Sequence, residues 1–302
     1  MGARTHGRDY RDYPVLPSGA AGAGGHPAAA MTVEGPSAGL ALRATAARTA
    51  VLLRNLPDPG AVVPGLTWTV AETAAHLVIA LKNYREIVLG AADVRAVSPL
   101  APDAETPTQY SAAYNAAELA RFGERDTRRL ADLLVPCADA FLDAAAVRHD
   151  GERILTGTGL SMTVPTMTAA LLGEQLIHGL DIARAARVPW PISRADALLV
   201  LSGVMVMLPD YLDRQRTAGL HVAYELRFRG GTRYRLQVDD GTATLTEAGR
   251  PVDCWVSAEP ATFLLLAYGR VSRRSQVVRG RMVAGGRKPW LAVASERLLT
   301  GP

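Results

Sequence analysis

Cysteine is scarce in this chain of 302 residues. The two cysteines, Cys137 and Cys254, lie far apart in the sequence, so they form neither a paired metal-binding spacing nor a disulfide framework. Sparse, unpaired cysteine is typical of proteins in a reducing compartment. We therefore expect a cytoplasmic protein whose fold does not depend on disulfide bonds.

Lysine and long hydrophobic runs are also scarce. Lys82 and Lys288 are the only lysines among 33 basic residues, and the net charge is +4. No dense basic run is interleaved with aromatic residues, which argues against a nucleic-acid partner. The longest apolar stretch, Ala195–Pro209, is too short to span a membrane and is interrupted by Ser202 and Gly203. We expect neither nucleic acid nor a membrane as a partner.

The sequence has enough apolar residues for a packed core, since 48% of its residues are hydrophobic and 21% are charged. Residues 1–36 differ from the rest, because polar residues are followed there by Gly, Ala and Pro. They lack the apolar segment of a secretory signal. We predict a disordered leader over 1–36, with Met31 as an alternative start.

Two periodicities divide the remaining chain. Apolar residues recur at helical spacing up to about residue 217, and from residue 218 they alternate with polar residues as in half-buried strands. We therefore predict a helical domain over 37–217 and a small α+β domain with an antiparallel sheet over 218–302. The predicted helices cover about 40–53, 70–89, 109–147 (broken near Gly123 or Pro136), 166–187, 194–216, 259–268 and 289–299, and the predicted strands cover about 222–228, 234–238, 252–257 and 277–283, with extended character in the connection 151–161.

Capping residues predict where two of these helices begin and end. Thr69 with Glu72 three residues later forms the pattern of a capping box, and Gly90 is suited to end the same helix. Pro165 suits the first turn of a later helix. Both helices contain a histidine among apolar neighbours.

Three side chains on these helices suggest a metal site. Glu174 and His178 are four residues apart, which places them on one helix face. With His76 from the other helix, they make two imidazoles and one carboxylate, the ligand count of a catalytic site for zinc or another divalent metal with an open position. The Glu-x-x-x-His spacing alone is more typical of a surface pair or a buried core histidine, so the set depends on the fold for its meaning.

The segment Trp68-Thr-Val-Ala-Glu-Thr-Ala-Ala-His-Leu77 and the segment Glu174-Gln-Leu-Ile-His-Gly-Leu-Asp-Ile-Ala-Arg184 resemble the mycothiol-dependent maleylpyruvate isomerase family. The resemblance extends over about residues 38–290 and is strongest in these two segments. It implies a DinB-like antiparallel four-helix bundle that binds the metal, followed by a domain similar to sterol carrier proteins. It also implies His76, Glu174 and His178 as the ligands, zinc as the metal and mycothiol as the thiol cosubstrate.

Two further residues are candidates for catalysis. Arg270 lies in the segment Leu266-Ala-Tyr-Gly-Arg270, which is similar to a Leu-x-x-Gly-Arg element of the family, and the resemblance implies that it binds a substrate carboxylate. Asp181 follows His178 by three residues and could orient its imidazole. The alternatives are a solvated basic turn at Arg270 and an ordinary ion pair of Asp181 with Arg184 or Arg187.

The functional prediction is a metal-dependent enzyme, monomeric or homodimeric, that isomerises a small unsaturated acid through an activated thiolate. One alternative is a mycothiol S-transferase, which would use the same activated thiolate on another electrophile. A second is a non-catalytic module that binds an apolar ligand, with Phe263, Leu264 and Leu266 lining a tunnel or simply forming a core. A regulatory partner protein is a third class, and no acidic interaction tail supports it.

Overall fold

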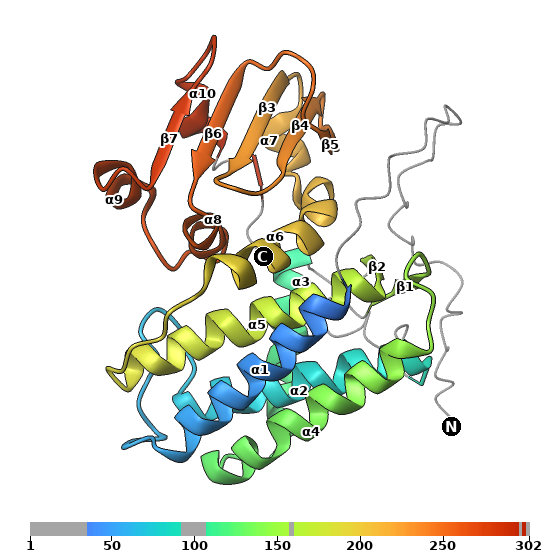
Figure 1. Ribbon diagram of the computed structural model, residues 1–302, viewed down its shortest axis with the longest axis vertical. Helices are drawn as coiled ribbons and strands as arrows, with labels where there is room; N and C mark the ends of the chain where they lie inside the picture. Colours follow the sequence, from blue (N-terminus) through green and yellow to red (C-terminus); the bar gives the residue numbers. More distant parts are fainter. Residues whose placement is uncertain (1–34, 92–106, 157–159, 296–297, 300–302) are drawn as a thin grey trace, which may run out of the picture. The chain divides into compact units, whose positions relative to one another are not determined.

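The computed structural model describes residues 35–91, 107–156, 160–295 and 298–299, and its helices and strands are shown in Figure 1. The predicted leader lies outside the described residues as far as residue 34. The helices before the main sheet are α1 (Gly35–Arg54), α2 (Val70–Leu89), α3 (Pro107–Arg121), α4 (Thr127–Ala146), α5 (Val164–Ala185), α6 (Arg194–Val204), the 3-10 helix η2 (Met205–Tyr211) and α7 (Arg214–Thr217).

The predicted limits of α2 are confirmed. The Thr69 hydroxyl accepts a hydrogen bond from the backbone N–H of Glu72, and the Glu72 carboxylate accepts one from the backbone N–H of Thr69 at 2.8 Å. Gly90 ends the helix with a φ of 71°, a left-handed conformation that glycine adopts without strain. These two caps fix where His76 lies along the helix.

The region 109–147 is broken near Gly123, and Pro136 lies inside α4. Asp126 explains the position of the break, because its carboxylate accepts the backbone N–H of Arg128 at 2.9 Å and starts α4 there. The single helix predicted over 194–216 is wrong: α6 is followed by η2, which contains Pro209, and by α7. Proline has no N–H to donate, which disfavours a continuous α-helix.

Helices α1, α2, α4 and α5 pack against one another, with α1 and α2 each in contact with both α4 and α5 (Figure 1). Their buried side chains form one apolar cluster that includes Leu42, Leu77, Leu134, Phe141 and Leu172. Because α5 is the most completely buried of these helices, a polar side chain on it must find a partner inside the protein.

The main sheet has the strand order β5-β4-β3-β6-β7. Neighbouring strands are antiparallel except for β3 and β6, which are parallel with Tyr224 opposite Cys254. The predicted antiparallel pairing is therefore correct for three of the four strand pairs, and the sheet as a whole is mixed. The strands are β3 (His221–Phe228), β4 (Arg233–Asp239), β5 (Thr242–Glu247), β6 (Cys254–Ala258) and β7 (Met282–Gly285).

The last third of the chain differs from prediction at three places, the first of which is strand β5, which was not among the predicted strands. Residues 277–283 do not form one strand: Val277 and Val278 end helix α9 (Arg273–Val278), and β7 starts only at Met282. Ser272 accounts for this, because its hydroxyl caps the backbone N–H of Ser275. The other helices here are α8 (Pro260–Ala267) and α10 (Leu291–Ala294), and α10 is shorter than predicted.

The extended character predicted for the connection 151–161 is confirmed. Strand β1 (Arg153–Leu155) lies there and pairs with β2 (Ser161–Thr163).

A second apolar cluster lies on the sheet and includes Val222, Tyr224, Leu236 and Val256. It is separate from the cluster between the helices. The division of the chain at residues 217 and 218 stays a prediction. Among the described residues, no helix has the length and apolar character needed to cross a bilayer.

Candidate metal centre

The fold brings together the three predicted ligands, which are almost a hundred residues apart in sequence. One ligand atom each from His76 on α2 and from Glu174 and His178 on α5 lie within 4.8 Å of one another. The Glu174 Oε2 atom is 3.0 Å from His76 Nε2 and 3.3 Å from His178 Nε2. Both histidines are buried, whereas the Glu174 side chain is 26% exposed, so solvent reaches the cluster beside the carboxylate.

Asp181 holds the other side of the His178 ring. Its Oδ2 atom is 3.1 Å from His178 Nδ1, in a position to accept the Nδ1–H. With Nδ1 held by Asp181, the Nε2 atom faces Glu174 and is the ring nitrogen through which His178 could bind a metal ion. The structure therefore brings Asp181 to the imidazole that it was predicted to orient.

Arg270 is the second partner of Asp181, and Arg184 and Arg187 are not. Its Nε and Nη2 atoms donate to the two carboxylate oxygens at 3.0 and 2.7 Å, and its Nη1 donates to the carbonyl of Tyr268 at 2.5 Å. The Asp181 side chain is fully buried and that of Arg270 is 18% exposed. Every guanidinium nitrogen of Arg270 thus has a protein acceptor, and the predicted binding of a substrate carboxylate by Arg270 stays a prediction.

Burial and hydrogen bonds have opposite effects on the pKa values of the two histidines and the two carboxyl groups in the cluster. Burial lowers the pKa of His76, even though Glu174 opposes this. Burial would also lower the pKa of His178, but its hydrogen bonds to Asp181 and Glu174 outweigh burial and raise the pKa to about 9. Burial disfavours ionised Glu174 and Asp181, and their hydrogen bonds to His178 nevertheless hold the pKa of both carboxyls below the usual range.

Trp68 forms one wall of the cluster. Its ring centroid is 5.0 Å from that of His76 and 6.2 Å from that of His178. The sequence places Trp68 just before the helix cap, which suggests only packing at the helix entry. The structure shows that this packing is against both imidazoles.

Three tyrosines that the sequence analysis did not single out interact electrostatically with Glu174. After burial, the Glu174 charge is the next cause that raises the pKa of Tyr84, Tyr211 and Tyr268. Tyr84 could have been found from sequence, because it follows His76 by eight residues and so lies two turns along α2. Tyr211 on η2 and Tyr268 after α8 give no such signal, since only the fold brings them to α5.

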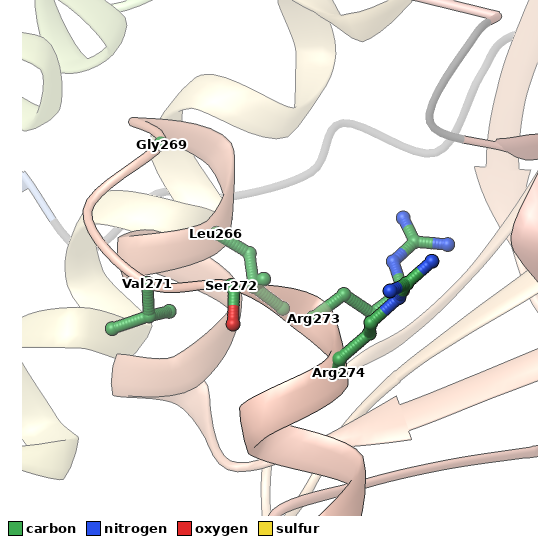
Figure 2. A pocket seen from close by; sticks show the side chains of 6 residues that line it. All are labelled: Leu266, Gly269, Val271, Ser272, Arg273 and Arg274. Carbon is green, nitrogen blue, oxygen red and sulfur yellow. The ribbon is translucent and has the colours of Figure 1, made fainter.

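A separate cavity of about 430 Å³ is lined by residues that flank Arg270 in the sequence, and the three candidate ligands do not line it (Figure 2). Its lining consists of Leu266, Gly269, Val271, Ser272, Arg273 and Arg274. The apolar residues predicted for a ligand tunnel do not line it, apart from Leu266. Leu264 is buried in the helical cluster, and Phe263 packs its ring on Phe228 with centroids 4.8 Å apart. These contacts are those of ordinary core residues.

The fold and the converging side chains define a helical and β-sheet protein with a candidate His-Glu-His centre. A family profile described as the mycothiol maleylpyruvate isomerase N-terminal domain matches residues 24–183, more than half of the chain. The chain belongs to this family. All three candidate ligands lie within the matched residues.

Solved structures give weaker similarity. A crystal structure of a histidine-to-alanine mutant of the mycothiol-dependent maleylpyruvate isomerase is 15% identical, with 79% of this chain and 90% of that chain covered and a TM-score of 0.49. Another crystal structure of that isomerase is 16% identical over the same coverage, with a TM-score of 0.45. The sec-alkylsulfatase Pisa1 from Pseudomonas sp. is 17% identical over 75% of this chain and 33% of its own, with a TM-score of 0.29. These scores add nothing to the family assignment, and no curated protein sequence matches the chain.

Proposed function

We propose that this protein is a metal-dependent enzyme that uses mycothiol to isomerise a small cis-unsaturated acid of the maleylpyruvate type. The observation that carries the proposal is the convergence of His76, Glu174 and His178 within 4.8 Å, in a chain of the mycothiol maleylpyruvate isomerase family. We further propose that it works in the cytoplasm, as a monomer or homodimer.

The donor set suits zinc. Two imidazole nitrogens and one carboxylate oxygen are zinc ligands of a common catalytic type, which leaves a fourth position for a ligand from outside. The hydrogen bond from His178 Nδ1 to Asp181 is the outer contact that zinc-binding histidines usually make. A zinc ion held by these residues would supply a positive charge that lowers the pKa of a nearby thiol, so that the thiolate is present at neutral pH.

The remaining work falls to the chain itself. We propose that α1, α2, α4 and α5 form a DinB-like antiparallel four-helix bundle over residues 37–217, which holds His76 and the two α5 ligands in fixed positions. Trp68 covers the imidazoles and limits access of water on that side. Residues 218–302 form a sterol-carrier-like domain that delivers Arg270 to Asp181.

The reaction needs no net proton transfer. The thiolate forms a carbon–sulfur bond with one carbon of the cis double bond. The π electron pair of the double bond then moves through the conjugated system to the carbonyl oxygen. Rotation about the resulting single bond is then free. Return of the electron pair re-forms the double bond as trans and expels the thiolate, so mycothiol is regenerated. In an S-transferase, by contrast, the thiol would stay attached to its electrophile.

Metal analysis and a thiol balance test this function. Purified wild-type protein is expected to contain about one zinc per chain, and His76→Ala, Glu174→Ala and His178→Ala are expected to lose it. His149→Ala is the matched control, because His149 is exposed and belongs to α4's C-terminal loop. Mycothiol should be required for turnover of maleylpyruvate and recovered unchanged.

Two results would contradict the proposal. If wild-type protein contains no stoichiometric metal, or if the ligand variants keep their metal, the assignment of the metal site is wrong. If one mycothiol is consumed for each product molecule formed, the reaction is thiol transfer and not isomerisation.

A further inference from the structure

Tyr268 brings a hydroxyl group to α5 at the residue that precedes the candidate ligand Glu174. It follows the last residue of α8, and its Oη atom would lie 3.1 Å from a Cβ atom built on Gly173, the residue before Glu174. Because Gly173 has no side chain, the phenol can approach the α5 backbone closely. No hydrogen bond joins this hydroxyl to any other residue in the described ranges, so its proton is available to a ligand.

Two contacts fix the position of Tyr268 relative to α5. At the ring end, Tyr268 packs at Gly173 together with Val200 of α6. At the backbone end, Arg270 donates to the carbonyl of Tyr268 while it also holds the carboxylate of Asp181 on α5. The hydroxyl is therefore a preorganised donor, which is what stabilisation of a developing charge requires.

The surroundings of this hydroxyl suit a polar group on an otherwise apolar ligand. Tyr84 and Tyr211 interact electrostatically with Tyr268, and all three tyrosines interact electrostatically with Glu174. Both Tyr84 and Tyr268 also pack on the apolar helical cluster. Neutral hydroxyl donors in apolar surroundings bind an oxygen that gains negative charge better than they bind an uncharged carbonyl.

We propose that Tyr268 donates a hydrogen bond to the conjugated carbonyl oxygen of the substrate, the atom that becomes an enolate oxygen when the thiolate adds. This inference rests on the proposed function and adds to it a specific donor for the oxyanion. The phenol keeps its proton throughout: the electron pair that reaches the oxygen on addition returns when the carbon–sulfur bond breaks.

Kinetics of Tyr268→Phe test the donor directly. Phenylalanine keeps the ring between Gly173 and Val200 and removes only the hydroxyl. With mycothiol and maleylpyruvate, we expect kcat to fall about 100-fold and KM to change little, because the bond strengthens only as charge develops. Tyr234→Phe is the matched control: this tyrosine is on β4 and packs against Phe228, and its kcat should equal that of wild type.

An infrared measurement gives a readout that does not depend on turnover. Pyruvate labelled with ¹³C at its ketone can serve as a carbonyl probe that lacks the double bond. Its ketone stretch should move to lower frequency on binding to wild type or Tyr234→Phe, and the shift should be lost in Tyr268→Phe, with zinc content unchanged in all three.

The outcomes separate this inference from the proposed function. If wild type does not isomerise maleylpyruvate but shows a carbonyl shift that Tyr268→Phe abolishes, the isomerase assignment fails and the Tyr268 donor stands. If Tyr268→Phe keeps both the wild-type kcat and the carbonyl shift, the donor is excluded while the isomerase assignment stands.

Discussion

At the scale of single residues, Asp181 has the most consequential contacts in the molecule. It is a fully buried carboxylate with a candidate metal ligand on one side and an arginine on the other. A buried charge is tolerated only when it is paired and hydrogen-bonded, and Asp181 meets this condition through His178 and Arg270. Its contact with His178 is the basis of the prediction that Asp181 orients this ring.

Asp181→Asn is expected to weaken zinc binding by about 10- to 100-fold. The amide has the shape of the carboxylate but not its charge, so it supports His178 less well and leaves Arg270 without a counter-charge. Competition with a chromogenic chelator measures the affinity. Asp143→Asn, at an exposed position of α4, serves as the control. An unchanged affinity in Asp181→Asn would show that Asp181 does not support the metal site.

The residue types of the site could be predicted from sequence, but their contacts could not. The spacing of Glu174 and His178, the apolar setting of His76 and the family resemblance together selected the three residues that the fold brings together. Arg270 was recognisable only through family resemblance, and its pairing with Asp181 depends on chain segments 89 residues apart. Tyr211 and Tyr268 have no local signal, because their position beside Glu174 arises from tertiary packing.

At the scale of elements, local chemistry decided where helices begin and end. The capping box at Thr69, the glycine at Gly90 and the proline at Pro165 were all readable in advance and are all present. Two nearby breakers, Gly123 and Pro136, could not be ranked from sequence. The structure places the break near Gly123, because Asp126 caps a new helix that continues through Pro136. Strand direction was also unreadable, because alternation of apolar residues is the same in parallel and antiparallel pairs.

Thr69→Ala tests how far the cap of α2 supports the site. Loss of the hydroxyl removes the hydrogen bond to the Glu72 backbone, which should lower the free energy of unfolding by about 1 kcal/mol. Urea denaturation of the metal-free protein measures the change. Thr67→Ala provides a comparison, because Thr67 is exposed and lies just outside the capping box. Equal stability of the two variants would mean that the capping box does not stabilise the helix that holds His76.

At the scale of the whole molecule, the last third of the chain is connected to the helices by apolar packing of α8 on the helical cluster and by polar contacts to α5. Arg270 to Asp181 is the most buried ion pair made by an arginine or a lysine among the residues that the structure describes. Arg184 adds to it by donating to the backbone carbonyl of Arg270 at 3.3 Å. A position in the last third of the chain is thereby connected to a candidate metal ligand on α5. We expect that metal binding and the stability of this contact depend on each other.

A double-mutant cycle on Arg270 and Asp181 measures that dependence. Arg270→Met removes one of the two partners of the buried Asp181 carboxylate and should reduce the free energy of unfolding by about 3–5 kcal/mol. It should also weaken zinc binding, because Asp181 loses the partner that holds it against His178. In the double variant Arg270→Met with Asp181→Asn, neither buried charge remains, so the combined loss of stability should be smaller than the sum of the single losses. Thermal unfolding with and without zinc supplies both quantities. If the single losses simply add, the two residues act independently, and the path from the C-terminal segment to the metal site through Asp181 is excluded.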